Sequence, residues 1–464
     1  MKNKSFKYRF KNSWCSILLG AFTAVMFNSC DSFVEVDLPN SQLAAEAVYQ
    51  NKATAVAALT SVYAKMRDSG LFTGSLSGLS VSLGLYADEL DLYGQQSGPQ
   101  TYYNNAFVPS SSVTRLLWNT SYNQIYSTNA VIEGVTASSA LTETEKNELI
   151  GEALVVRALI HFYLTNLYGS IPYVKTTDFE VNTTIGKVST QDVYLLAIED
   201  LEAATALLSE SYSSTGRIRP NKFAARTLLA RINLYAENWE VASNEASAVL
   251  NHTELYSLEN NLDNEFLRTS QSTIWAFIPT TNSTLEGVGF QFVSLPPPVS
   301  AMSDQLLNVF ETGDERKIKW TKAVTNGTDT KYHPFKYKQG SAGTATEHSV
   351  VFRLAELYLI RAEARAKAGD LIGAIEDLNQ IRNRAGLPNT TATTTEDILT
   401  AVLKERQVEL FTEHGHRFFD LKRTYQLDTV LSSKPGWNST DALLPLPEPE
   451  LIINPNLNPQ NPGY

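Results

Sequence analysis

Apolar residues recur at intervals of three and four along most of the chain, which is the period of an amphipathic helix. One such segment covers residues 44–67. Another begins near Thr142, whose spacing to Glu145 is that of a capping box, and Gly169 and Pro172 are expected to end it. Further helices are predicted over residues 190–209, 220–237, 239–251, 351–368, 371–385 and 396–413. The chain is therefore predicted to be mainly α-helical.

Two of the predicted helix pairs are similar to each other in sequence. Residues 228–246 align with residues 359–378 so that alanines coincide, as Ala230 does with Ala362. Each copy contains a helix, a tight turn and a second helix, and small residues allow two helices to cross closely. This pattern favours a tetratricopeptide-like hairpin, and a plain helical hairpin is the alternative. Long loops are predicted at 69–117, 211–219, 279–304 and 323–349.

The N-terminus has the pattern of a secretory signal. Five cations fall within the first eleven residues, and an uncharged, mostly apolar run from Trp14 to Phe27 follows. Cys30 stands directly after a small residue, so the segment resembles a bacterial lipoprotein signal in which residues 1–29 are removed and Cys30 is acylated. Phe27 departs from the usual leucine of that signal. The alternative is a retained membrane helix over residues 12–30, because that uncharged stretch approaches the ~20 residues of a span.

Charge excludes two classes of partner. The whole chain carries a formal net charge of −11, and loss of the signal would remove five positive charges. An acidic chain without basic runs is not expected to bind nucleic acid, or anionic lipid through a polybasic patch. Cys15 would leave with the signal, so no internal disulfide is expected, and the predicted membrane attachment is the lipid alone.

The C-terminal segment is rich in proline. Residues 434–464 contain seven prolines, so this segment is expected to run extended rather than helical. It also contains Leu443, Leu444, Leu446, Leu451, Ile452 and Ile453. These are too many apolar residues for a disordered tail, and the segment is predicted to lie along the helical body.

The chain resembles the SusD/RagB-like family of outer-membrane nutrient-binding lipoproteins. The resemblance rests on five segments in the family's order: 152–172, 216–239, 352–388, 405–423 and 443–464. It implies about four tetratricopeptide-like hairpins and a second lobe of loops and short strands that carries the ligand site. It divides the mature chain into an N-terminal region, 30–270, and a C-terminal region, 271–464, which contains the hairpin 351–385 and the tail.

The resemblance also implies a function. Such a protein is lipid-anchored at the cell surface, captures glycans or other nutrients, and delivers them to a SusC-like TonB-dependent transporter. It is not an enzyme and needs no cofactor. Peptides are an alternative ligand for the same uptake role, and a scaffold without a small ligand is a further alternative.

Aromatic residues among polar ones indicate where a sugar could bind, because flat rings stack on sugar faces while amides and carboxylates bind hydroxyls. In the stretch 86–118 the candidates are Tyr86, Asp88, Tyr93, Tyr102 and Tyr103. The loop 279–300 is predicted to form a rim with Phe290, Gln291 and Phe292, and Trp320 and Tyr337 flank another loop. Trp118 and Trp275 are expected to be core residues instead.

The sequence contains no strong pattern of catalytic residues. A glycoside hydrolase would need two facing carboxylates, and Asp88 with Asp91 is a pair of that kind, although an acidic chain offers many such pairs. His414 and His416 lack a third ligand at a usual distance for a metal site. The family resemblance places them in a structural motif in which Arg417 is expected to pair with Asp420. No nucleophile elbow is present in the sequence.

Overall fold

The computed structural model describes residues 45–340 and 344–464. The signal segment 1–29 and Cys30 lie outside the described residues. The long helices are α3 (Lys52–Asp68), α6 (Ser112–Ala137), α7 (Glu143–Tyr168), α9 (Thr190–Leu207), α10 (Lys222–Tyr235), α11 (Trp239–Leu250), α15 (Leu354–Ala368), α16 (Leu371–Arg384) and α17 (Thr395–Glu409). The mainly helical fold predicted from the sequence is confirmed. None of the described helices is long and apolar enough to cross a membrane.

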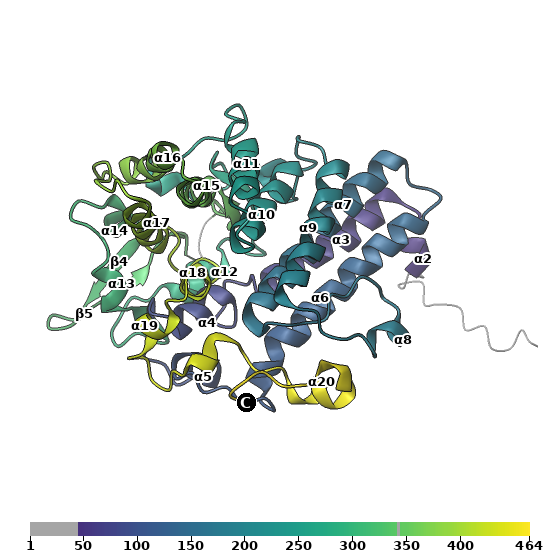
Figure 1. Ribbon diagram of the computed structural model, residues 1–464, viewed down its shortest axis with the longest axis horizontal. Helices are drawn as coiled ribbons and strands as arrows, with labels where there is room; N and C mark the ends of the chain where they lie inside the picture. Colours follow the sequence, from purple (N-terminus) through teal and green to yellow (C-terminus); the bar gives the residue numbers. More distant parts are fainter. Residues whose placement is uncertain (1–44, 341–343) are drawn as a thin grey trace, which may run out of the picture. The chain divides into compact units, whose positions relative to one another are not determined.

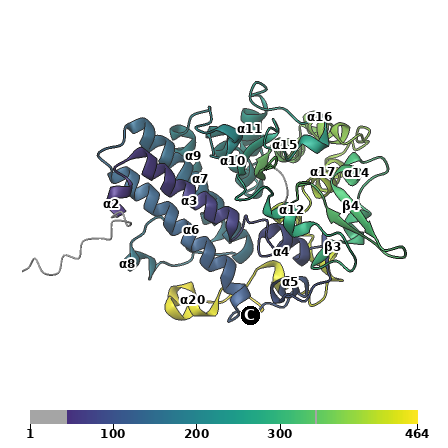
Figure 2. The same ribbon diagram turned by 180° about the vertical axis from the view of Figure 1, so that it is seen from behind.

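Within residues 48–464 the long helices pack in chain order, each against the next. Figures 1 and 2 show α3, α6, α7 and α9 at one end, α10 and α11 in the middle, and α15, α16 and α17 at the other end. Successive packed pairs in the described part are α3 with α6, α7 with α9, α10 with α11, and α15 with α16. The last two pairs are the hairpins that the sequence similarity predicted.

Buried alanines allow the two helices of each hairpin to pack closely. Ala230 and Ala362 are both fully buried, as are Ala242 and Ala374 on the second helices of the two pairs. A methyl side chain at each position allows the helix axes to approach, which is the role that the sequence pattern predicted. The helix ends also agree with their signals, since Thr142 and Glu145 form a capping box at the start of α7.

Short strands and short helices form a second set of elements. The strands are β1 (Leu90–Leu92), β2 (Thr273–Phe277), β3 (Ser300–Met302), β4 (Thr321–Thr325), β5 (Thr330–Pro334) and β6 (Ser349–Arg353), and they pair antiparallel as β1–β3, β2–β6 and β4–β5. The short helices are α2 (Ala45–Val48), α4 (Leu79–Tyr86), α5 (Ser97–Tyr103), α8 (Phe179–Asn182), α12 (Leu285–Phe290), α13 (Asp304–Leu307), α14 (Glu315–Lys319), α18 (His416–Arg423), α19 (Leu427–Leu431) and α20 (Glu448–Ile453).

Several segments differ from the prediction. The predicted loop 279–304 contains α12 and β3, and the predicted loop 323–349 contains β5. The stretch 69–117, expected to be a loop, contains α4, α5 and the start of α6. All eight residues of α4 are buried, so this helix has no polar face and therefore no amphipathic period for the sequence to display. The helix expected from residue 351 begins at Leu354, because residues up to Arg353 form the fully buried strand β6 against β2.

The proline-rich tail lies along the helical body, as predicted, but it is not extended throughout. Leu444 donates its backbone N–H to the carbonyl of Leu167 at 2.8 Å, and the Asn461 side chain donates to the carbonyl of Tyr168 at 2.8 Å. Helix α20 interrupts the extended path, because a proline is tolerated in the first turn, where its missing N–H has no partner to lose. The expectation that the tail contains no helix was wrong.

One large hydrophobic core runs through the body. It draws buried residues from both sides of the predicted 270/271 division, including Leu59 of α3, Trp275 of β2 and Leu446 of the tail. The division into regions 30–270 and 271–464 stays a prediction about sequence organisation.

Buried ion pairs join the short elements to the last long helices. Glu409, fully buried at the end of α17, accepts from Arg353 at 2.5 Å and from Arg316 at 3.0 Å, and it also pairs with Arg384. Arg353 reaches further, to Glu413, at 2.8 Å. Burial alone would raise the pKa of Glu409, but the three guanidinium groups outweigh it and hold that pKa well below its usual range.

A similar balance between burial and ion pairing makes the contacts of Glu413 sensitive to acid. Burial opposes ionisation of Glu413, but Arg353 and Lys336 outweigh it and lower its pKa to about 2. Because the folded-state pKa lies below the unfolded one, this stabilisation is complete above pH ~4.5 and is lost as the pH falls toward 2. We expect Glu413→Gln to remove about 3 kcal/mol of the unfolding free energy at pH 7 and to flatten its decline below pH ~4.5.

Urea unfolding at pH 7, 4.5 and 3 measures the unfolding free energy of the wild type and of Glu413→Gln. Glu240→Gln, at an exposed carboxylate of α11, is the control. An unchanged pH profile in Glu413→Gln would contradict the assignment.

Candidate functional site

Several predicted ligand rings lie in the core. Tyr86 is fully buried in α4, and its hydroxyl donates to the carbonyl of Asp441 at 2.8 Å. Tyr102 lies on α5 rather than in a polar loop, is only 4% exposed, and packs edge-on against Tyr86 and Phe107. The expectation that Tyr102 is an exposed loop ring was wrong, because the short helix α5 turns it inward.

Trp320 and Tyr337 occupy a second, smaller core. Trp320 is fully buried, and its Nε1–H donates to the carbonyl of Leu262 at 3.0 Å. The Tyr337 hydroxyl accepts the backbone N–H of Val350 at 2.9 Å. Each polar tip is occupied by the protein's own backbone, and neither ring presents an open face. Trp118 and Trp275, expected to be core residues, are also buried.

The predicted rim at 290–292 is largely turned inward. Phe290 and Phe292 are each 6% exposed, and Phe292 packs edge-on against His333. Gln291 is half-buried and donates to the carbonyl of Tyr337 at 2.9 Å. The exposed large apolar residues of this loop are Val288 and Val293, which carry no aromatic ring.

Asp88 forms a structural ion pair. Both of its carboxylate oxygens accept from Arg417, at 2.8 and 2.7 Å. The expected pairing of Arg417 with Asp420 was therefore wrong, since Asp420 instead pairs with Arg406 and Arg423. Asp88 joins the start of β1 to α18, and its bidentate pairing leaves it unsuited to the facing-carboxylate role of a hydrolase.

The nearby histidines belong to the same structural motif. His414 and His416 are buried, and burial lowers the pKa of both side chains. Nε2 of His414 lies 2.9 Å from the carbonyl of Val350. Among residues 45–340 and 344–464, no three His, Cys, Asp or Glu side chains cluster as a metal site would require.

Two predicted rings remain accessible and lie on one surface. Tyr93 follows β1, where its backbone N–H donates to the carbonyl of Val299 at 2.7 Å, and Tyr103 is the last residue of α5. Both rings are half-buried. Lys331 lies 5.6 Å from the centre of the Tyr93 ring, and Lys434 lies 4.1 Å from that of Tyr103. With Asp91 these four residues make up what we call the tyrosine surface.

The electrostatics of the tyrosine surface show that its members are close. Burial raises the pKa of Tyr103, and the nearby groups Asp91 and Tyr93 raise it further. Burial lowers the pKa of Lys434 to about 8, partly offset by Asp91. The surface therefore combines two partly open rings with a carboxylate and two ammonium groups, which can stack on a flat ligand and bind its polar edge.

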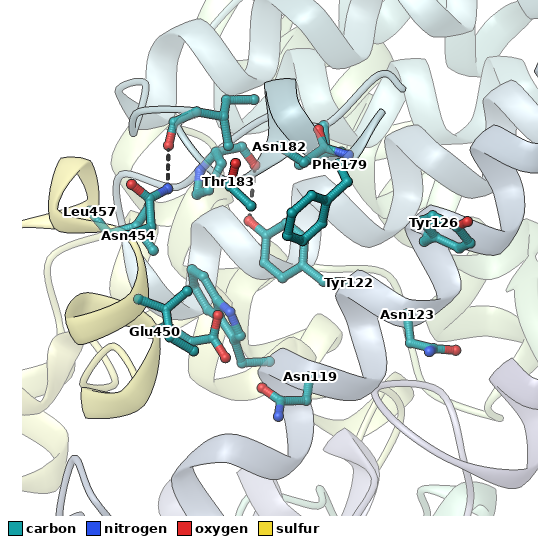
Figure 3. A pocket seen from close by; sticks show the side chains of 15 residues that line it. Asn119, Tyr122, Asn123, Tyr126, Phe179, Asn182, Thr183, Glu450, Asn454 and Leu457 are labelled. Carbon is teal, nitrogen blue, oxygen red and sulfur yellow. Dashed lines mark hydrogen bonds between the residues drawn. The ribbon is translucent and has the colours of Figure 1, made fainter. Parts of the chain in front are cut away.

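The structure also contains a groove that was not predicted from the sequence. It has a volume of about 400 Å³ and lies between α6, the segment around α8, and the C-terminal tail (Figure 3). We call it the α6 groove; it is lined by Trp118, Asn119, Tyr122, Asn123, Tyr126, Pro172, Val174, Phe179, Asn182, Thr183, Ile185, Glu450, Ile453, Asn454 and Leu457. Tyrosines and asparagines at helical spacing, with no charged residue among them, were the sequence signal that could have revealed it.

A stack of helical hairpins that carries a lobe of short strands defines a helical-repeat protein with an attached lobe. Two family models match this chain, one described as "SusD family" over residues 303–464 and one as "Starch-binding associating with outer membrane" over residues 85–234. Together these segments make up more than half of the sequence. The chain belongs to the SusD/RagB-like family.

Individual proteins are similar over nearly the whole chain. SusD-like protein P2 of Formosa agariphila is 25% identical over 92% of this chain and 95% of its own length, and SusD-like protein P25 of the same organism is 22% identical over 97% and 99%. A SusD superfamily protein from Bacteroides vulgatus has the same fold, with a TM-score of 0.78, 21% identity, and coverage of 90% of this chain and 100% of its own. A laminarin-binding SusD-like protein has a TM-score of 0.74 and 24% identity over 90% and 100%.

The position of Asp88 leads to a stability prediction. Asp88→Asn removes a buried, bidentate carboxylate and leaves Arg417 unpaired, so it should lower the unfolding free energy by about 3 kcal/mol. Asp91→Asn should change it by less than about 1 kcal/mol, because burial already raises the pKa of Asp91 and disfavours its charged form. Urea denaturation of both variants tests this, and equal stabilities would show that the Asp88–Arg417 pair does not hold β1 to α18.

Proposed function

We propose that this protein is a surface lipoprotein of the outer membrane that binds oligosaccharides and passes them to a SusC-like TonB-dependent transporter, without altering them chemically. The observation that carries the proposal is the match of residues 85–234 to a family described as starch-binding and associating with the outer membrane. The laminarin-binding neighbour supports a glycan ligand as well. The tyrosine surface falls within the matched segment through Tyr93 and Tyr103.

The chemistry of the tyrosine surface fits a sugar. Two half-buried rings, each with a lysine ammonium over it, offer apolar surface for stacking, while Asp91 and Lys331 offer an acceptor and donors for hydroxyl groups. Lys434 already donates to the carbonyl of Leu85 at 2.7 Å. The rings are held by short elements, β1 and α5, so their positions are fixed before a ligand arrives. Binding through a few such contacts would be weak, in the micromolar to millimolar range, which suits a protein that must release its ligand to a transporter.

The accessible rings of Tyr93 and Tyr103 can be tested as ligand contacts by substitution. Tyr93→Ala combined with Tyr103→Ala should weaken binding of laminarin and starch about tenfold or more, because loss of two stacked rings removes much of a weak interaction. The melting temperature should change little, since both rings are half-buried. Affinity electrophoresis and isothermal titration calorimetry measure the binding.

Controls separate ligand rings from structural rings. Tyr425→Ala removes a ring that is 88% exposed elsewhere and should leave binding intact. Tyr102→Ala should instead lower the melting temperature, because truncating a buried aromatic side chain costs ~3–5 kcal/mol. Retention of wild-type affinity in the Tyr93/Tyr103 variant would place the ligand elsewhere, and new reducing ends on incubation with the glycans would favour an enzyme.

The anchor and partner are tested together. Wild-type protein should incorporate a clickable fatty acid and co-purify with a transporter from gently solubilised outer membranes. Cys30→Ala should lose the label and be released or left unprocessed. Equal labelling of both proteins would contradict a lipid at Cys30, and recovery of the protein alone, under conditions that preserve similar complexes, would contradict the transporter partner.

A further inference from the structure

The α6 groove has the chemical composition of a carbohydrate site. On one outward face of α6, Asn119 lies four residues before Asn123 and Tyr122 four residues before Tyr126, so amides alternate with rings. Figure 3 shows these residues on one wall and Phe179 at the neighbouring one. A solvent-facing helix surface normally carries charged residues, and this one carries none at these positions.

The rings of the groove are open to a ligand. Phe179 is 76% exposed and Tyr126 is 53% exposed. The hydroxyl of Tyr122 donates to the carbonyl of Pro172 at 2.9 Å, which holds that ring in place. Opposite, Asn454 donates to the carbonyl of Ile185 at 2.8 Å, so the tail forms a fixed wall rather than a loose flap. The groove is therefore preformed, with apolar faces available for stacking.

A polar hollow of about 360 Å³ adjoins the groove. It is lined by Lys65, Ser69, Asn119, Thr120, Asn123 and Gln124, so the two exposed asparagines belong to both cavities. Gln124 is 1% exposed and donates to the carbonyl of Ser69 at 3.1 Å, but its Oε1 has no hydrogen-bond partner among the described residues. The exposed amides of Asn119 and Asn123, with the hydroxyls of Ser69 and Thr120, give this hollow donors and acceptors for sugar hydroxyl groups.

The charges of the two cavities indicate a neutral ligand. Among the described lining residues, Glu450 is the one ionisable acid of the groove and Lys65 the one base of the hollow. Burial raises the pKa of Glu450, which disfavours its charged form. A strongly anionic or cationic ligand would find little complementary charge here, whereas an uncharged chain of sugars would find rings for its faces and amides for its hydroxyls.

We infer that the α6 groove and its polar hollow form a second saccharide-binding surface, which takes a segment of an uncharged glucan. This inference rests on the proposed function. The surface comprises residues from α3, α6, α8 and the tail, whereas the tyrosine surface comprises residues from β1, α5, β5 and the segment after α19. Two weak sites that engage one polymer would raise the avidity for long glucans more than the affinity for short ones.

The test isolates this surface. Tyr126→Ala combined with Phe179→Ala is introduced both into the wild type and into the Tyr93/Tyr103 variant. With laminarin as the probe, the Tyr126/Phe179 variant should bind the polymer about tenfold or more weakly than the wild type, because two stacking faces are lost. Laminarihexaose should retain measurable weak binding to the Tyr93/Tyr103 variant, and the combined variant should lose it.

A control variant and three separate outcomes show how the Tyr126/Phe179 test is to be interpreted. Tyr425→Ala together with Ile372→Ala removes two exposed apolar side chains elsewhere and should leave polymer binding unchanged. Wild-type affinity in the Tyr126/Phe179 variant overturns the inference alone. Absence of glucan binding in the wild type overturns the proposed ligand, and the inference with it. If the Tyr126/Phe179 variant binds glucan normally but recovers less transporter, the groove is a protein-docking surface and the saccharide assignment is wrong.

Discussion

The ionic cluster around Glu409 is the contact on which the arrangement of the second half of the chain depends. One carboxylate meets guanidinium groups from β6, α14 and α16, and Arg353 extends the cluster to Glu413. Removing any one partner would leave a buried charge uncompensated, which is far costlier than losing a surface pair. The cluster therefore fixes where the short strands sit against the last helices. Its contribution is more to a single geometry than to net stability, because burying so many charges is itself expensive.

That constraint also decides which residues are free to bind. Positions near the cluster and the two cores, including Tyr86, Tyr102, Trp320 and Tyr337, have their rings enclosed, and the polar tips of three of them are bonded to backbone. The aromatic side chains that remain available lie at the ends of short elements, as Tyr93 and Tyr103 do, or on an outward helix face, as Tyr126 does. A rigid interior with a few open rings at its surface is a sound basis for weak, repeatable capture of a flat, hydroxylated ligand.

The two aromatic surfaces differ in character. The tyrosine surface places ammonium and carboxylate groups beside its rings, whereas the α6 groove offers amides and almost no charge. They therefore suit different parts of a ligand: a charged edge can bind hydroxyls strongly at a few points, and a neutral groove can hold a longer stretch of chain. Binding at several weak points allows tight hold of a polymer and easy release of its short products.

The amino-acid sequence alone specifies the helical class, the two alanine-lined hairpins, the capping box at Thr142 and the family, because all of these depend on local spacing or on segments that keep their order along the chain. It could not show α4, since a helix buried on every side has no amphipathic period. The packing of α5 against its neighbours turns Tyr102 inward and leaves Tyr103, the next residue, half-open, because one residue step on a helix rotates a side chain by about 100°. Tertiary packing also decides that Asp88 pairs with Arg417, over three hundred residues away, and that Asn119 and Tyr126 of α6 meet Phe179 and the tail in one groove. Such contacts depend on how distant segments pack against each other, and that packing cannot be read from composition or residue spacing.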